Sequence, residues 1–126
     1  MRTYLALAAL SLPAPPALAL PGDGTDPAMT FATCTGRLSA QMEHQWIVDP
    51  PASDRTRNQR ARMIELLYAV TSPGEGRRVW NRRVEAKMAQ AQLLTRARYD
   101  AHPAQAARAQ RLADRELSAC LSLLLS

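Results

Sequence analysis

Two cysteines, one near each end of the chain, limit the folds open to this sequence more than any other feature. They are Cys34 and Cys120 in a chain of 126 residues. If they pair, the two ends of the folded domain must meet, and the long covalent loop stabilises the fold by about 4.5 kcal/mol in the chain-entropy model. The alternatives are two buried free thiols and an intermolecular bridge.

The amino terminus favours pairing because it has the features of an export signal. Arg2 supplies positive charge, residues 4–12 are almost entirely apolar, and Ala17 and Ala19 are small residues at the spacing that a signal peptidase recognises. We therefore predict a signal peptide over residues 1–19, cleaved near Ala19. The mature protein would then be periplasmic or secreted, in an oxidising compartment where cysteines pair.

Two membrane-attached alternatives fit the amino terminus less well. An uncleaved anchor would need roughly 20 consecutive apolar residues, more than this run provides. Lipidation of Cys34 would require the cysteine to lie closer to the apolar run. No segment of the mature chain is apolar enough to span a bilayer, so we expect no transmembrane segment there.

The rest of the chain divides into a short N-terminal segment and one domain. Residues 20–28 are rich in glycine, proline and aspartate without any period, which predicts a flexible mature N-terminus. Residues 29–126 are long enough for one modest hydrophobic core, which we expect to be a helical bundle domain.

Apolar residues recur at three- and four-residue steps in four segments, which predicts four amphipathic helices. We expect the first to start after Thr30 as N-cap and to end at Asp49. The second would start after Ser53 or Asp54 and end before Gly74. Their predicted inward residues are Phe31, Cys34, Leu38, Met42 and Trp46 in the first, and Arg60, Met63, Ile64, Leu66, Leu67, Val70 and Thr71 in the second.

The third predicted helix covers about residues 77–99, and the fourth follows Pro103. Proline suits the first position of a helix, and the residue before it disfavours helical geometry. The predicted inward residues are Trp80, Val84, Met88, Ala91 and Leu94 in the third helix, flanked by Val79 and Leu93, and Ala106, Ala109, Ala113, Leu117, Cys120 and Leu124 in the fourth.

No run alternates with the period of two that a strand requires. Four helices with short connections favour an all-α, up-down-up-down four-helix bundle, in which helices 1 and 4 are antiparallel neighbours. This arrangement brings Cys34, near the start of helix 1, to Cys120, near the end of helix 4. The topology and the cysteines together predict one disulfide joining helices 1 and 4.

The sequence offers no recognisable catalytic constellation. Only His44 and His102 could serve as an imidazole base, and no Gly-x-Ser-x-Gly nucleophile motif is present. Four spaced Cys or His ligands of a structural metal site are also missing, as is a phosphate-binding glycine fingerprint. We therefore predict a non-enzymatic protein with no catalytic residues, no metal and no cofactor.

The charge is basic, with 16 Lys and Arg against 11 Asp and Glu. Arg77 and Arg78 lie at the expected start of the third helix, where cations oppose the helix dipole, and Arg82 follows one turn later. These three residues are our candidate site for an anion or a partner. The alternative is an ordinary solvated surface with ion pairs such as Arg82–Glu85.

These features favour an accessory module of the bacterial envelope, whose partner is another envelope protein. The alternative function is binding of an anionic small molecule, a lipid headgroup or a polymer through the arginine clusters. Nucleic acid would suit the charge, but it does not suit an exported protein, so we do not expect it as a partner.

Overall fold

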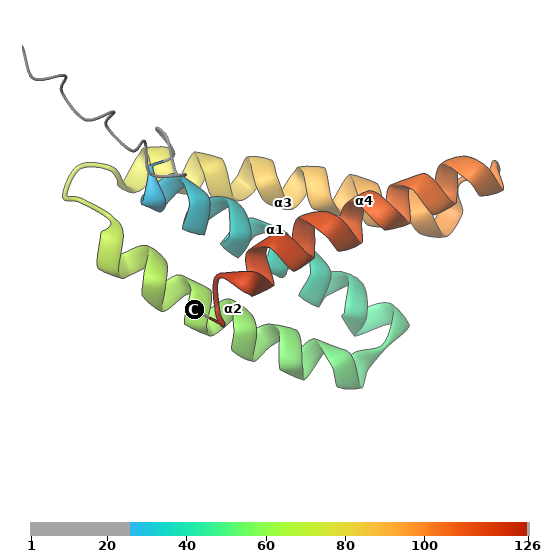
Figure 1. Cartoon of the computed structure of the whole chain (residues 1–126), viewed down its shortest axis with the longest axis horizontal. Coiled ribbons are helices and arrows are strands. Elements are labelled where there is room, and N and C mark those ends of the chain that lie inside the picture. The colour runs from blue at the N-terminus through green and yellow to red at the C-terminus, as the bar shows by residue number, and fades with distance from the viewer. Residues whose placement is uncertain (1–25, 126) are drawn as a thin grey trace, which may run out of the picture.

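In a computed structural model of the protein, which describes residues 26–125, the chain forms four α-helices and, over that range, no strand (Figure 1). They are α1 (Pro27–Val48), α2 (Pro50–Val70), α3 (Gly76–Tyr99) and α4 (Pro103–Ser122). The prediction of an all-α fold with four helices is confirmed. The predicted signal peptide and residues 20–25 of the predicted flexible segment lie outside the described residues.

The first helix begins four residues earlier than the sequence pattern suggested. Asp26, not Thr30, is the N-cap, and its Oδ1 accepts a hydrogen bond of 2.9 Å from the backbone N–H of Ala28. Pro27 occupies the first position of the helix, where its missing N–H would have had no partner within the helix. Residues 27 and 28, which we expected to be flexible, are therefore helical.

The second helix also begins early. Asp49 is the C-cap of α1 and the N-cap of α2, so the two helices are joined by a single residue. Pro50 then starts α2 ahead of Ser53 and Asp54, the caps that the sequence predicted. The same use of proline at the first position explains this shift.

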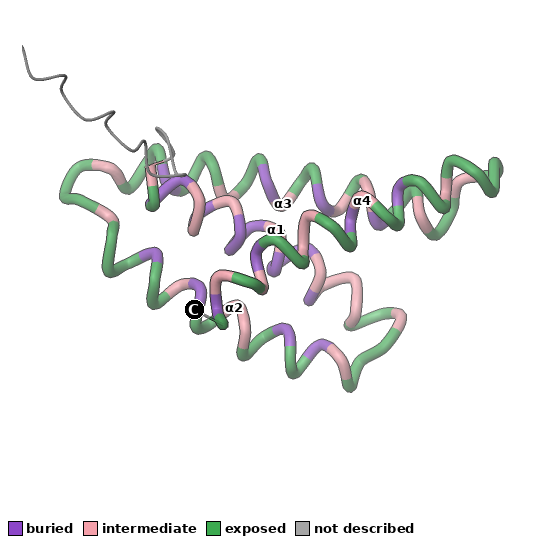
Figure 2. Tube along the Cα trace, in the orientation of Figure 1, coloured by how far each residue is buried: buried purple, intermediate pink, exposed green. Residues whose placement is uncertain are grey.

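The helices pack around α1, which contacts α3 and α2 most extensively. The fourth helix lies mainly against α3 and contacts α1 over a smaller area (Figure 1). Buried positions accordingly follow most of α1 but occur at intervals on the other helices (Figure 2). Because α2 and α3 are not among the extensively packed pairs, this arrangement does not establish the predicted up-down-up-down topology.

The contact between α1 and α3 is close because it is made by small residues. A Cβ atom on Gly36 would overlap the carbonyl oxygen of Arg83 and lie 2.9 Å from the backbone nitrogen of Lys87. Glycine is the residue that allows such an approach of two backbones. On the α3 side, Ala86 meets Gly36, and its Cβ would lie 3.0 Å from a Cβ placed on the glycine.

Two apolar clusters form the core. One lies where the beginnings of α1 and α3 meet the end of α2, and the other surrounds the cysteines and the end of α4. The first contains Ala28, Met29, Ala32, Leu67 and Val79, and the second contains Cys34, Leu38, Met63, Cys120 and Leu124. Between α3 and α4, the amide of the buried Gln90 donates a hydrogen bond of 3.1 Å to the carbonyl oxygen of Ala113.

The predicted inward face of the third helix is wrong for its largest residues. Trp80, Val84 and Met88 are 59%, 41% and 57% exposed, whereas the buried residues of α3 are Val79, Ala86, Gln90 and Leu94. The physical reason is the close approach at Gly36, which admits small side chains and turns the bulky ones outward. The pattern of apolar residues along α3 does not by itself show which face of the helix is turned toward α1.

The other helices follow their predicted faces more closely. In α4, Ala109, Ala113 and Cys120 are buried as expected, as is Leu124 just after the helix, and Ala106 and Leu117 are half-buried. In α1 the exception is Trp46, and in α2 the exceptions are Leu66 and Val70, all of which are exposed. Met42 is the last buried residue of α1, so Trp46 lies one turn beyond the packed part of that helix.

Candidate functional site

The predicted disulfide is confirmed. Cys34 of α1 and Cys120 of α4 are bonded, with their Cα atoms 5.3 Å apart at a sequence separation of 86. Both sulfurs are therefore committed within the chain, which excludes the alternatives of free thiols, an intermolecular bridge and lipidation of Cys34. Arg37 adds an ion pair of 2.6 Å to Glu116, which also joins α1 to α4.

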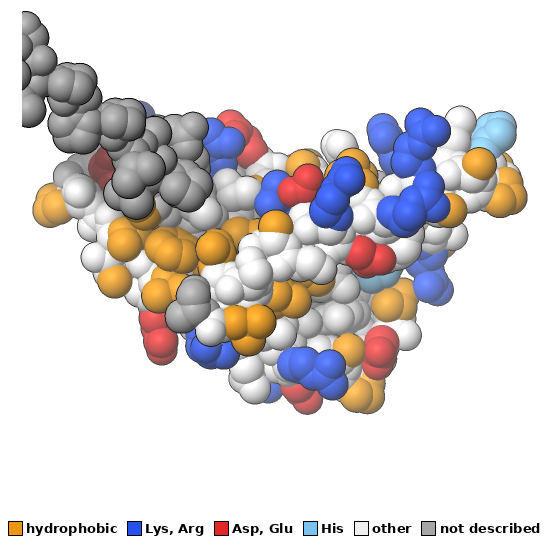
Figure 3. Space-filling model, viewed as in Figure 1, with side chains coloured by type: hydrophobic (Ala, Val, Ile, Leu, Met, Phe, Trp, Pro, Cys, Tyr) orange, Lys and Arg blue, Asp and Glu red, His pale blue; other side chains and the backbone are white. Residues whose placement is uncertain are grey.

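The tail after α4 is held against α2. Arg62 donates a hydrogen bond of 2.9 Å to the carbonyl oxygen of Leu124, and Leu124 packs in the same cluster as Met63. Figure 3 shows apolar side chains gathered where this end of the chain meets α1 and α2, and cationic side chains along α4. Arg62 thus anchors the tail to α2.

Of the three predicted site arginines, Arg78 has a structural role. Its Nη1 lies 2.7 Å from Asp26 Oδ2 and 3.3 Å from Glu75 Oε1. The hydrogen bond from Arg78, together with the one from the backbone of Ala28, lowers the pKa of Asp26. The same contact with Asp26 raises the pKa of Arg78. Arg78 therefore connects the start of α3 to the cap of α1, and its charge is balanced by two carboxylates.

The structure brings all three predicted arginines to one shallow hollow, the Arg77 hollow, of about 400 Å³. Arg77, Arg78 and Arg82 line it together with Glu85. Within residues 26–125, neither Arg77 nor Arg82 has a carboxylate at ion-pair distance. The expected Arg82–Glu85 pair is thus absent, and the two free guanidinium groups lie on either side of the neutralised Arg78 in sequence.

A second hollow, which the sequence did not predict, lies between α1, α2 and α3 and has a volume of about 120 Å³. We call it the Trp80 hollow. Its lining includes Gly36, Ser39 and Met42 of α1, Arg60 of α2, and Trp80, Arg83 and Val84 of α3. Its existence follows from the fold, because α2 and α3 both pack on α1 without closing extensively on each other.

Two guanidinium groups line the Trp80 hollow. Arg60 donates a hydrogen bond of 2.7 Å from Nε to Ser39 Oγ, and the Arg83 guanidinium lies 5.5 Å from the centre of the Trp80 ring. In the described part of the chain neither arginine forms an ion pair. Lys87, in contrast, is paired with Glu43 at 2.7 Å. The hollow therefore combines an apolar wall with two cations that lack a counter-charge.

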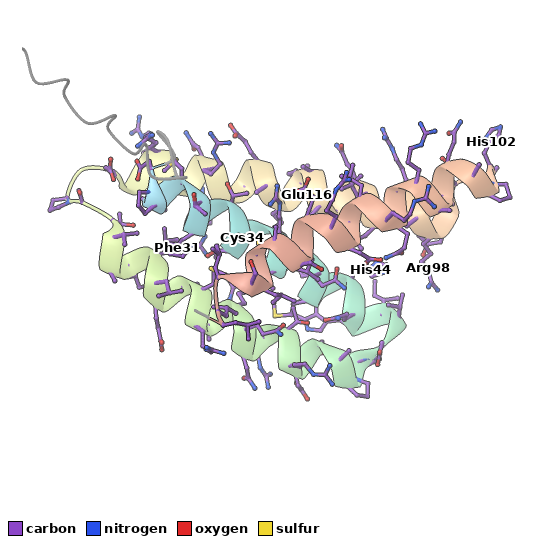
Figure 4. All side chains as sticks on the ribbon, viewed as in Figure 1. Phe31, Cys34, His44, Arg98, His102 and Glu116 are labelled. Carbon is purple, nitrogen blue, oxygen red and sulfur yellow. A yellow bond between two sulfur atoms is a disulfide. The ribbon has the colours of Figure 1, made fainter. Side chains whose placement is uncertain are left out.

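The histidines do not form a joint site. Figure 4 shows His44 and His102 well apart, with His102 at the far tip where α3 meets α4. Burial lowers the pKa of His44, and the nearby positive charge of Arg98 lowers it further. Over the described range, no group of three or more His, Cys, Asp or Glu residues could hold a metal ion.

Comparisons with known proteins found no relative of this chain. No protein-family model matches this chain, and neither the curated proteins nor the solved structures contain a match to it. Of the four helices in the described part of the chain, none is both long and apolar enough to cross a membrane. The function must therefore be argued from the surface that the fold presents.

Proposed function

We propose that this protein is an exported, non-enzymatic helical module that binds another protein of the bacterial envelope. The observation that supports this most is the exposure of its aromatic residues. Trp46, Tyr68, Trp80 and Tyr99, which are all the tryptophans and tyrosines of residues 26–125, are each more than half exposed. Tryptophan and tyrosine are concentrated in protein–protein interfaces, where they contribute much of the binding energy.

The scaffold beneath these aromatic residues suits a binding role. The disulfide fixes α4 to α1, and the close contact at Gly36 fixes α3 to α1. A surface held in place before binding loses less conformational entropy when it meets a partner. A disulfide of this kind is also compatible with the oxidising compartment that the predicted signal peptide implies.

Cross-linking in intact native cells, followed by purification, tests this function. The wild-type protein should be recovered in a covalent complex of defined mass, and a double variant, Trp46→Ser with Trp80→Ser, should give much less of it. A matched control, Ala89→Ser, changes an exposed residue of α3 and should give the wild-type yield. Recovery of the wild-type protein only as a free monomer would count against a partner.

Binding of an anionic ligand is the second candidate, and it is supported by Arg77 and Arg82 in the Arg77 hollow. Their guanidinium groups could hold a phosphate or carboxylate by bidentate hydrogen bonds. Titration with inorganic phosphate should then show an affinity that falls steeply with added salt. The affinity should be lost in the Arg77→Ala, Arg82→Ala double variant. A flat titration of the wild-type protein would remove this candidate.

A further inference from the structure

We propose that the Trp80 hollow docks an acidic amphipathic helix of the partner protein. This inference rests on the proposed function and adds the place and the chemistry of the contact. The helix would place one large apolar side chain in the hollow and present carboxylates to Arg60 and Arg83. Three properties of the surface lead to this occupant: its size, its spacing and its charge.

The size fits a single side chain. The hollow has a volume of about 120 Å³, and Met42 and Val84 are among the apolar residues that line it. A cavity of about 150 Å³ holds benzene, so this slightly smaller space suits a leucine side chain, which has fewer carbon atoms than benzene. Aromatic and aliphatic anchors in such pockets provide most of the energy of an interface.

The spacing fits a helix. Trp80, Val84 and Met88 follow one another at four-residue steps and are all exposed. At about 1.5 Å of rise per residue they cover about 12 Å along α3. Two turns of a partner helix, with apolar residues at every third or fourth position, would cover this length. Trp80 and Val84 also line the hollow, so the exposed row and the hollow form one continuous surface.

The charge selects an acidic partner over a basic one. Arg60 and Arg83 line the hollow without a carboxylate partner among residues 26–125. Glu43 and Lys87 also line it, but they pair with each other at 2.7 Å, so the two arginines leave the hollow with a net positive charge. Arginine pairs with carboxylates in a planar, bidentate geometry. A basic helix would bring like charges together and would be rejected.

A lipid surface fits these observations less well than a helix. An interfacial helix buries an apolar face in the membrane while its cations remain at the headgroups. Here the apolar wall of Trp80 and Val84 shares a recess with Arg60 of a different helix, α2. Contact with a flat bilayer would leave the recess unfilled, and a protruding side chain would fill it.

Isothermal titration of the purified mature protein with synthetic helical peptides tests the proposal. The probe peptide has leucines at every third or fourth position and glutamates between them, and its counterpart has lysines in place of the glutamates. The glutamate peptide should bind, and the lysine peptide should not. Trp80→Ala, Arg60→Gln and Arg83→Gln should each weaken binding about tenfold, which corresponds to about 1.4 kcal/mol. Arg111→Gln removes an exposed cation of α4, which lines neither hollow, and should leave the affinity unchanged.

Several results would overturn the proposal. These are the absence of binding by the glutamate peptide, equal binding of both peptides, and affinities unaffected by the three variants. Binding to phosphatidylglycerol vesicles without binding to the peptide would assign the surface to lipid instead. If the peptide fails but the native cross-linked complex persists, the module binds its partner through another surface. If both fail, the proposed function falls as well.

Discussion

Gly36 of α1 lies so close to the backbone of Arg83 in α3 that no side chain fits between them. This contact determines which face of α3 is buried. Small residues such as Ala86 meet α1, and the bulky Trp80 and Val84 are left at the surface. The proposed interaction surface is thus a consequence of the close contact between α1 and α3.

Replacing Gly36 by alanine should destabilise the protein by about 1–3 kcal/mol, the usual result of overpacking. The atoms that a Cβ would meet belong chiefly to the backbone of Arg83 and Lys87, which cannot move aside as a flexible side chain can. Chemical denaturation of the purified variant measures this difference.

Gly76→Ala is the matched control for that experiment. Gly76 begins α3, and a Cβ there would meet nothing within 4 Å. Alanine reduces the entropy of the unfolded chain and favours the helix, so stability should be unchanged or higher by up to about 1 kcal/mol. Equal stability losses at Gly36 and Gly76 would show that α1 and α3 do not pack as closely as described.

Trp80→Ser should leave the free energy of unfolding within about 0.5 kcal/mol of the wild-type value, as exposed substitutions do. Leu94→Ala, in the same helix, should lower it by about 2–5 kcal/mol because Leu94 is only 3% exposed. Denaturant titrations of both variants measure the contrast. A large loss at position 80 would place the tryptophan in the core, as its periodicity alone suggested.

Removing the disulfide by the Cys34→Ser, Cys120→Ser double substitution should lower stability by up to about 4.5 kcal/mol, because the bond closes a loop over a sequence separation of 86. Thermal unfolding with and without a reducing agent checks the same effect in the wild-type protein. The reductant should have no effect on the double variant. An unchanged melting temperature on reduction would contradict the role assigned to the bond.

Lowering the pH should reduce the free energy of unfolding because of His44. The pKa of this residue is lower in the folded state than its ordinary value of 6.5. Above pH 6.5 the imidazole is neutral in both states. Below it the unfolded chain binds the proton first, so stability falls until the folded protein is protonated too. His44→Gln should reduce this loss in a denaturation series run from pH 7 downward. An identical pH dependence in the variant would refute the assignment.

The sequence predicted what depends on local pattern and covalent chemistry. The four helices follow from apolar residues at helical spacing, and the Cys34–Cys120 bond follows from two cysteines placed to meet. The starts of α1 and α2 were misplaced because Pro27 and Pro50 took the first helical position. Proline at that position makes the preceding residue the N-cap, here Asp26 and Asp49, ahead of the polar residues that were predicted as caps.

The candidate site was less predictable because it depends on three helices at once. The pattern placed Trp80 inward, since nothing in α3 itself shows that Gly36 of α1 would draw its small residues close. Arg60 and Arg83 are far apart in sequence, and only the packing of α2 and α3 on α1 brings them to one hollow. An interior glycine in a predicted helix was the one signal of a close contact.

The protein is proposed to bind its partner at the Trp80 hollow. A photo-reactive amino acid placed at position 80 tests this proposal most directly. After irradiation of intact native cells, position 80 should yield a discrete adduct. Mass spectrometry should map the cross-linked segment to an acidic amphipathic helix of another protein. The same residue at position 89, an exposed site elsewhere on α3, should yield none. No adduct from position 80, or the same adducts from both positions, would contradict the account.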